Sequence, residues 1–228
     1  MTARKPVRPT PPARSLRTDP PPRPPRPDLI ICCEGENTEP LYLEAFAARH
    51  GVHLKRGTHI FGPCGVPETV FECALKKKKE KDHENRRNRT EFRVWIVIDV
   101  DEHAQRIPGL LKRAENKGIE VALSNPCVEV WALYHFDPPP TAELDRHMAQ
   151  SKLQQRMPSY DKDQGKYFDL DRMNPGYEKA VRNARQAREC AEREGTILAN
   201  PASSLDRLME LIRQMGSRPQ PTPASNPA

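Results

Sequence analysis

Residues 92–101 read Phe-Arg-Val-Trp-Ile-Val-Ile-Asp-Val-Asp, an apolar run that ends in two aspartates. β-Branched residues dominate the run, and apolar side chains occupy both sets of alternating positions. Such a composition is typical of a strand buried on both faces, as in a parallel sheet covered by helices. Asp99 and Asp101 point the same way if strand geometry continues to the end of the run. Ligands of open α/β sheets usually bind at the carboxyl edge, so we expect the functional site there.

The segments around this run alternate between strands and helices. Three further apolar stretches are predicted as strands, at 28–33, 54–61 and 119–123. Helices are predicted at 40–51, 67–88 and 104–117 and, because Ser124-Asn125-Pro126 supplies a polar cap followed by a proline, at 126–136. After a proline run at 137–140 the pattern is more polar, with helices expected at 141–157, 177–194 and 201–215. This order predicts an α/β fold with a mostly parallel sheet between helices.

The two ends of the chain have a different composition from the centre. Residues 1–27 hold ten prolines, seven basic residues and one acid, and therefore carry the whole formal net charge of +6. With little to bury, this tail and residues 216–228 are expected to be disordered. A solvated leader is the favoured interpretation of the first tail, and a basic arm that attracts nucleic acid is the alternative. The expected organisation is a core at 28–140 and a helical C-terminal part of the same domain at 141–215.

The apolar and cysteine content indicates a cytoplasmic protein that does not enter a membrane. No apolar stretch is long enough to cross a bilayer, and the basic amino terminus lacks the apolar segment of a secretory signal. The six cysteines form no Cys-x-x-Cys pair, and Cys32, Cys33 and Cys127 lie in apolar contexts typical of buried, reduced thiols. A zinc site formed by Cys64, Cys73 and a nearby histidine is an alternative that the spacing does not favour.

Four acidic residues follow three different predicted strands: Glu34, Asp99, Asp101 and Glu129. Carboxylates of this kind suit Mg²⁺ or Mn²⁺, which bridge to substrate phosphates and lower the pKa of an attacking water. Glu34 is then a candidate general acid or base, while the aspartates hold the ion. Glu129 is the only charged residue of an otherwise apolar helix, which favours a metal or hydrogen-bond partner over simple helix-dipole stabilisation. A strand-terminal acid by itself often only caps the next helix.

Two basic segments are candidate phosphate contacts. Residues 76–89 contain eight basic residues and three acids, and include Lys78 and Arg86. A solvated helix end and a phosphate-binding patch near the active edge explain this segment equally well. Lys166 lies between two predicted helices, where it could reach a phosphate, although a plain surface turn fits its local pattern better.

Together, these motifs resemble the RloB-like proteins, which are built on a Toprim-type domain. The resemblance covers roughly residues 28–213. Its motifs are Cys-Glu-Gly-Glu-Asn-Thr-Glu-Pro at 33–40, Asp-Val-Asp-Glu-His at 99–103, Ser-Asn-Pro to Trp at 124–131 with His-Phe at 135–136, Tyr167, and the stretches 180–187 and 200–203. The resemblance implies a Toprim-like sheet, a catalytic glutamate at Glu34, and Mg²⁺ held by Asp99 and Asp101. It also implies an anti-phage or abortive-infection nuclease that works with an ABC/SMC-like ATPase.

Other functions fit the residues less well, and one stays open. A haloacid-dehalogenase-like phosphatase usually has Thr or Val two positions after its Asp-x-Asp, where His103 stands here, and a phosphoaspartyl receiver has nearly the reverse order of acids. The chain has no G-x-x-x-x-G-K-[ST] loop, so any ATP dependence comes from a partner. A non-catalytic nucleic-acid-binding or regulatory subunit remains the alternative to a nuclease, and the sequence does not choose DNA over RNA.

Overall fold

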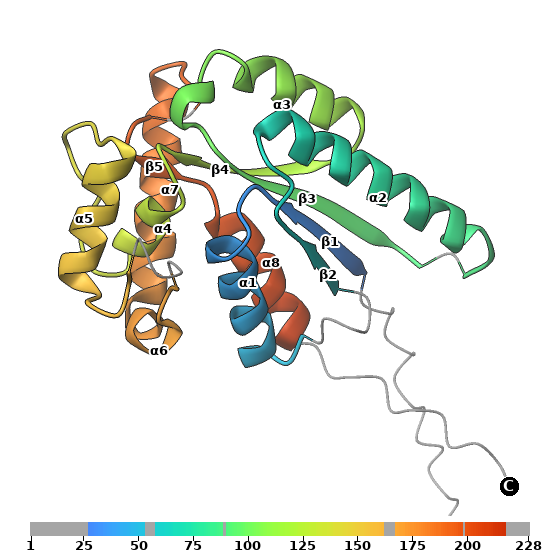
Figure 1. Cartoon of the computed structure of the whole chain (residues 1–228), viewed down its shortest axis with the longest axis horizontal. Helices are drawn as coiled ribbons and strands as arrows, with labels where there is room; N and C mark the ends of the chain where they lie inside the picture. Colours follow the sequence, from blue (N-terminus) through green and yellow to red (C-terminus); the bar gives the residue numbers. More distant parts are fainter. Residues whose placement is uncertain (1–26, 53–57, 89, 162–166, 198, 218–228) are drawn as a thin grey trace, which may run out of the picture.

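A computed structural model describes residues 27–52, 58–88, 90–161, 167–197 and 199–217 of the chain. Its centre is a five-stranded sheet in the order β2-β1-β3-β4-β5 (Figure 1). Strands β1 to β4 run parallel to one another, and β5 runs antiparallel to β4. The strands are β1 (Asp28–Cys33), β2 (Thr58–Phe61), β3 (Phe92–Asp99), β4 (Glu120–Asn125) and β5 (Ala202–Ser203). The predicted α/β class with a mostly parallel sheet is confirmed.

Helices cover both faces of the sheet, which explains why β3 is apolar at every position from Val94 to Ile98. The side chains of Trp95 and Val97 belong to one buried cluster, whereas those of Ile96 and Ile98 belong to another on the opposite face. Helices α2 (Pro67–Asn88) and α3 (Ile107–Asn116) pack on the second face. The first face carries α1 (Thr38–Arg49), α4 (Glu129–Leu133), α5 (Arg146–Arg156), α6 (Leu170–Met173), α7 (Tyr177–Arg193) and α8 (Asp206–Ser217) (Figure 1).

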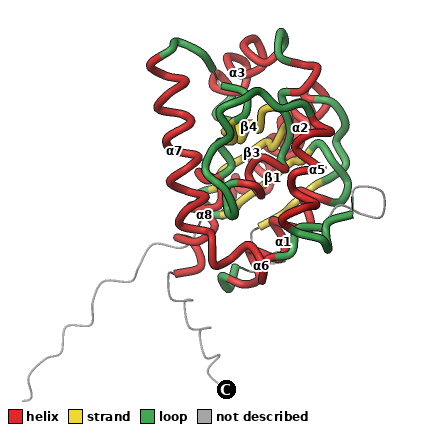
Figure 2. Tube along the Cα trace, turned by 90° about the vertical axis from the view of Figure 1, so that its left-hand side faces the viewer, coloured by secondary structure: helices red, strands yellow, loops and turns green. Residues whose placement is uncertain are grey.

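The C-terminal helices share the larger core with the amino-terminal strands and helix. This cluster includes Leu29 of β1, Phe46 of α1, Ile212 of α8, and Tyr160, which lies in the loop after α5. Helices α7 and α8 contact each other, and α8 also contacts α1 (Figures 1 and 2). Residues beyond 140 therefore complete the hydrophobic face of the sheet, and they bring polar side chains toward its carboxyl edge.

Two predicted helix starts are wrong for the same reason. Instead of capping a helix, Ser124 and Asn125 continue β4, where Ser124 pairs with Asp99 of β3 and both residues pair with β5. The Asn125–Pro126 peptide is cis, and α4 begins only at Glu129. Likewise, the residues after Pro201 form β5, and α8 begins at Asp206. Hydrogen bonding between two segments almost 80 residues apart has overridden the local helix-start signal.

Several expectations fall outside the described residues. These are both tails, the beginning of the strand expected at 54–61, and Lys166. Within the described part of the chain, no helix is both long and apolar enough to cross a membrane.

Candidate active site

Asp99 and Asp101 lie at the carboxyl end of β3 and are joined by one arginine. Strand β3 ends at Asp99, and the chain then turns, with Val100 N donating to Ser124 O (2.8 Å) and Asp101 N donating to Pro126 O (3.1 Å). Asp101 has a φ of +29°, a region that aspartate tolerates better than most residues. Arg146 donates from Nε to Asp101 Oδ2 (2.7 Å) and from a terminal nitrogen to Asp99 Oδ2 (3.2 Å). The two carboxylates thus converge through a turn, without continued strand geometry.

Glu34 and Glu39 approach the same edge from the segment that follows β1. Because β1 and β3 are neighbours, Glu34 Oε2 accepts a hydrogen bond from Asp99 N (3.2 Å). Burial raises the pKa of Glu34, and this hydrogen bond opposes the shift. Glu39 stands in the first turn of α1, and a Cβ on Gly35 would lie 2.5 Å from its Oε2, so only glycine permits this approach. Burial, followed by Glu129 and Glu34, raises the pKa of Glu39 to about 7.

Glu129 is held by two side chains from the C-terminal part of the chain. It is 2% exposed at the start of α4, and its Oε1 accepts hydrogen bonds from Tyr160 Oη (2.5 Å) and Gln150 Nε2 (3.3 Å). Its other oxygen, Oε2, is buried and has no hydrogen-bond partner among the described residues. The hydrogen-bond partner predicted for this acid therefore exists, but it satisfies only one of the two carboxylate oxygens.

The site carries more negative charge than its one arginine compensates. Asp99 is 4% exposed, and its Oδ1 is also buried, with no hydrogen-bond partner in the part of the chain that the structure describes. Burial raises the pKa of Asp99 well above its ordinary value, and Glu39 and Glu129 raise it further, while Arg146 lowers it. A buried carboxylate oxygen without a partner is costly unless a proton, a water or a cation satisfies it. The free oxygens of Asp99 and Glu129 are therefore compatible with a hard cation, whose preferred ligands are oxygens.

The acids do not form a closed ligand cage. Among the described residues, no three carboxylates have oxygens that all lie within 4.8 Å of one another. Mg²⁺ usually keeps several waters and contacts only one or two protein carboxylates, so an open arrangement is compatible with it. The four acids predicted as metal ligands are thus close enough to influence one another's pKa values. They are not all placed to coordinate one ion directly.

Four residues of this site were missed by sequence reasoning: Glu39, Arg146, Gln150 and Tyr160. Glu39 belongs to the 33–40 motif and could have been selected from it. Arg146 and Gln150 lie in α5, a polar helix with several similar residues, so local sequence does not distinguish them. Tyr160 resembles any core aromatic residue until its hydroxyl is seen to reach Glu129.

The basic segment of α2 lies at the opposite end of the sheet from these acids. Lys81 pairs with Asp28 at the first residue of β1 (2.6 Å between Nζ and Oδ2), and Lys78 Nζ stands 4.9 Å from the ring centre of Phe92, where β3 begins. Arg86 is exposed and lies farther along the same helix, toward its carboxyl end. The expectation of a patch near the active edge is wrong for Lys78 and Arg86, because α2 runs antiparallel to the strands and away from their carboxyl ends.

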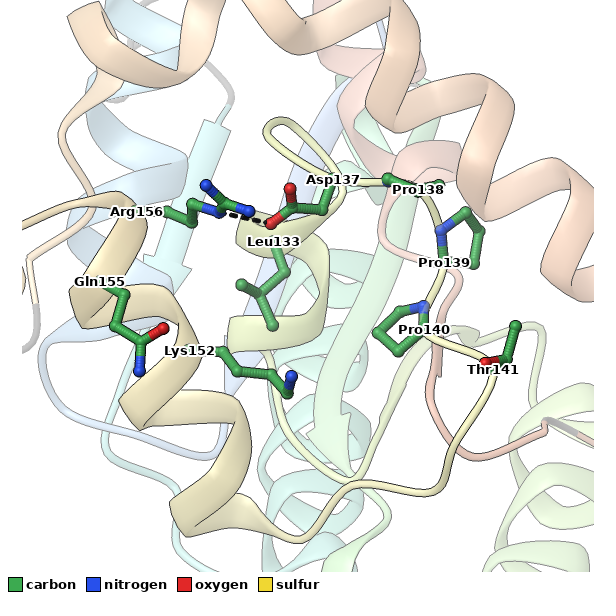
Figure 3. A pocket seen from close by; sticks show the side chains of 9 residues that line it. All are labelled: Leu133, Asp137, Pro138, Pro139, Pro140, Thr141, Lys152, Gln155 and Arg156. Carbon is green, nitrogen blue, oxygen red and sulfur yellow. Dashed lines mark hydrogen bonds and ion pairs between the residues drawn. The ribbon is translucent and has the colours of Figure 1, made fainter.

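A cavity of about 380 Å³ lies beside α4 and α5, and the acids of the carboxyl edge are not among the residues that line it (Figure 3). Leu133, the proline run at 138–140 and Lys152 line it, and Arg156 pairs with Asp137 at its rim (2.8 Å). Its basic residues are Lys152, for which the described residues supply no ion pair, and Arg156, which Asp137 neutralises, so it lacks the concentrated charge found at the carboxyl edge. The carboxyl edge is the stronger candidate for chemistry.

Comparison with known proteins identified one family. The model of a family described as RloB-like protein matches residues 29–212. Neither the curated proteins nor the solved structures gave a match. The matched region contains all the strands apart from the first residue of β1, and every acidic residue of the site.

Proposed function

This chain belongs to the RloB-like protein family, and on that premise we propose that it is a metal-dependent nuclease of the Toprim type. The observation that carries the proposal is the pair of buried oxygens, Asp99 Oδ1 and Glu129 Oε2, for which the described residues supply no hydrogen-bond partner. They stand among carboxylates whose mutual repulsion a divalent cation would relieve. The proposed cofactor is Mg²⁺ or Mn²⁺, and the proposed substrate is a nucleic acid phosphodiester.

The charge of the site supports a requirement for metal. Five acids and one arginine would repel a phosphodiester, so a substrate of this class needs an added cation to approach. Asp99 and Asp101 would hold the ion, with Glu129 beside them. When bound, such an ion polarises the phosphodiester and lowers the pKa of an attacking water.

Two side chains of the chain itself have proton-transfer and anchoring roles in this proposal. Glu34 has a pKa raised by burial and is oriented by the amide of Asp99, which suits a group that takes and returns a proton. Arg146 presents a guanidinium whose planar donors match a phosphate as well as a carboxylate. The proposed biological role is the effector of an anti-phage or abortive-infection system that acts with an ABC/SMC-like ATPase.

The test is metal-dependent cleavage of plasmid DNA and total tRNA by the full chain, alone and with the proposed ABC/SMC-like ATPase partner. We expect cleavage with Mg²⁺ or Mn²⁺, loss of cleavage with EDTA, and at least a hundredfold loss in Asp99→Asn, whose side chain keeps the shape but not the charge. Glu102→Gln is the matched control, because Glu102 is an exposed acid of the same motif. Equal cleavage by wild type and Asp99→Asn would refute the proposal.

A non-catalytic subunit is the second candidate, and one observation favours it. Arg146 already bridges Asp99 and Asp101, as a cation would, so the two aspartates share an internal counterion. In that case the protein binds nucleic acid or the ATPase, and cleaves nothing under any metal condition. Absence of cleavage by the complex, together with unchanged nucleic-acid binding in Asp99→Asn, would support this role.

A further inference from the structure

Three cysteines from separate elements meet on the sheet face that α2 covers. Cys32 belongs to β1, Cys64 to the segment after β2, and Cys73 to α2, and their Sγ atoms all lie within 4.8 Å of one another. Cys32 is fully buried, whereas Cys64 and Cys73 are half-buried. The histidine considered as a partner of Cys64 and Cys73 is thus replaced by a third thiol that sequence spacing did not suggest.

The spacing of the sulfur atoms is close to that of a metal site. Thiolates bound to zinc at about 2.3 Å in a tetrahedral arrangement are about 3.8 Å apart, so sulfurs within 4.8 Å need to move by no more than about an ångström. Among the described residues, no fourth His, Cys, Asp or Glu joins the cluster. The half-exposed positions of Cys64 and Cys73 leave room for a ligand from solvent.

The chemistry of the cluster differs from that of the carboxylate site. Soft thiolates select d¹⁰ ions such as Zn²⁺ and Cu⁺, whereas carboxylates select Mg²⁺ and Mn²⁺. Burial, followed by the hydrogen bond to the neighbouring Cys73 thiol, raises the pKa of Cys64 to about 12. A metal ion bound here would take the place of thiol protons. Three thiolates around a divalent ion leave one net negative charge, and Lys77 lies nearby, 4.6 Å above the ring of Phe61.

We propose that Cys32, Cys64 and Cys73 bind one thiophilic d¹⁰ metal ion, with the fourth ligand supplied by solvent. The ion would join β1, the segment after β2, and α2. That segment also hydrogen-bonds to the residues of the active edge, because Cys64 N donates to Cys33 O (3.0 Å) and Gly65 N to Glu34 O (3.3 Å). The metal therefore fixes the backbone beside Glu34 without touching its carboxylate.

The probe is Co²⁺, whose thiolate charge-transfer absorption in the near ultraviolet is absent when only carboxylates bind it. The full chain is reduced under anaerobic conditions, kept in excess Mg²⁺, and titrated with Co²⁺ and then Zn²⁺. We expect a band that saturates at one equivalent per chain and disappears as Zn²⁺ displaces the cobalt. Zn²⁺ should also raise the melting temperature of wild type.

Matched variants separate this site from other thiols and from the carboxylates. Cys64→Ser with Cys73→Ser should abolish the band, while Cys190→Ser, at a half-buried position on α7, should keep it. Asp99→Asn should also keep it, since the acidic edge takes no part. Absence of the band in wild type would overturn the proposal and leave three small apolar core residues. A band that survives the double substitution would overturn it equally.

Discussion

Replacing Glu39 with glutamine should stabilise the metal-free protein, and increasingly so as pH rises. Glu39 is 6% exposed, and burial together with Glu129 and Glu34 raises its pKa from 4.5 to about 7. Between those two values the folded protein binds a proton that the unfolded chain has released. Stability contributed by this proton is complete below pH 4.5 and is lost as pH rises toward 7. Glutamine keeps the shape of the side chain and cannot ionise.

The size of the effect follows from the difference between the two pKa values. A difference of roughly 2.5 units at 1.36 kcal/mol per unit corresponds to about 3 kcal/mol at pH 8, and to about 1 kcal/mol at pH 5. For a chain of this length, about 3 kcal/mol raises the melting temperature by roughly 6–12 °C.

The assay is urea unfolding in EDTA from pH 5 to pH 8, with wild type, Glu39→Gln and Glu44→Gln. Glu44 is a half-buried glutamate of the same helix, so its substitution controls for loss of one charge outside the acidic site. The free-energy advantage of Glu39→Gln should grow by about 2 kcal/mol across the range and shrink when Mg²⁺ is added. A difference between Glu39→Gln and wild type that does not change with pH would refute the reasoning.

Three further predictions concern the same site. Mg²⁺ at ten times its Kd should stabilise wild type by about 1.4 kcal/mol, a shift of roughly 3–6 °C, and should leave Asp99→Asn nearly unchanged in thermal unfolding. Arg146→Gln should destabilise the metal-free protein by about 2 kcal/mol, because Asp99 then loses the counterion that Arg146 provides. Saturating Mg²⁺ should restore most of the lost stability, and a loss that Mg²⁺ does not reduce would argue against a cation site. Tyr160→Phe should cost about 1–2 kcal/mol in urea unfolding, since Glu129 keeps only the weaker hydrogen bond from Gln150, and an unchanged midpoint would contradict that role.

The sequence by itself determined the strand-and-helix order and the edge at which the acids gather. Residues 92–99 are apolar on both faces, which requires helices on both sides of the sheet, and parallel strands place their carboxyl ends at one edge. The sequence pattern alone therefore predicted that Glu34 and Asp99 lie at the same edge of the sheet, although 65 residues separate them. The burial of Cys32, Cys33 and Cys127 was predictable from the sequence, because each of them adjoins apolar residues.

Only the tertiary structure decided which partners those acids have. Arg146, Gln150 and Tyr160 reach the site because the C-terminal helices pack against the first face of the sheet, and no local pattern encodes that packing. The pairing of β4 with β5 likewise overrode a helix-start signal at Pro126, and the course of α2 carried Lys78 away from the site while bringing Cys73 to Cys32. Periodicity fixes which face of an element is buried, but the residues it meets depend on the whole core.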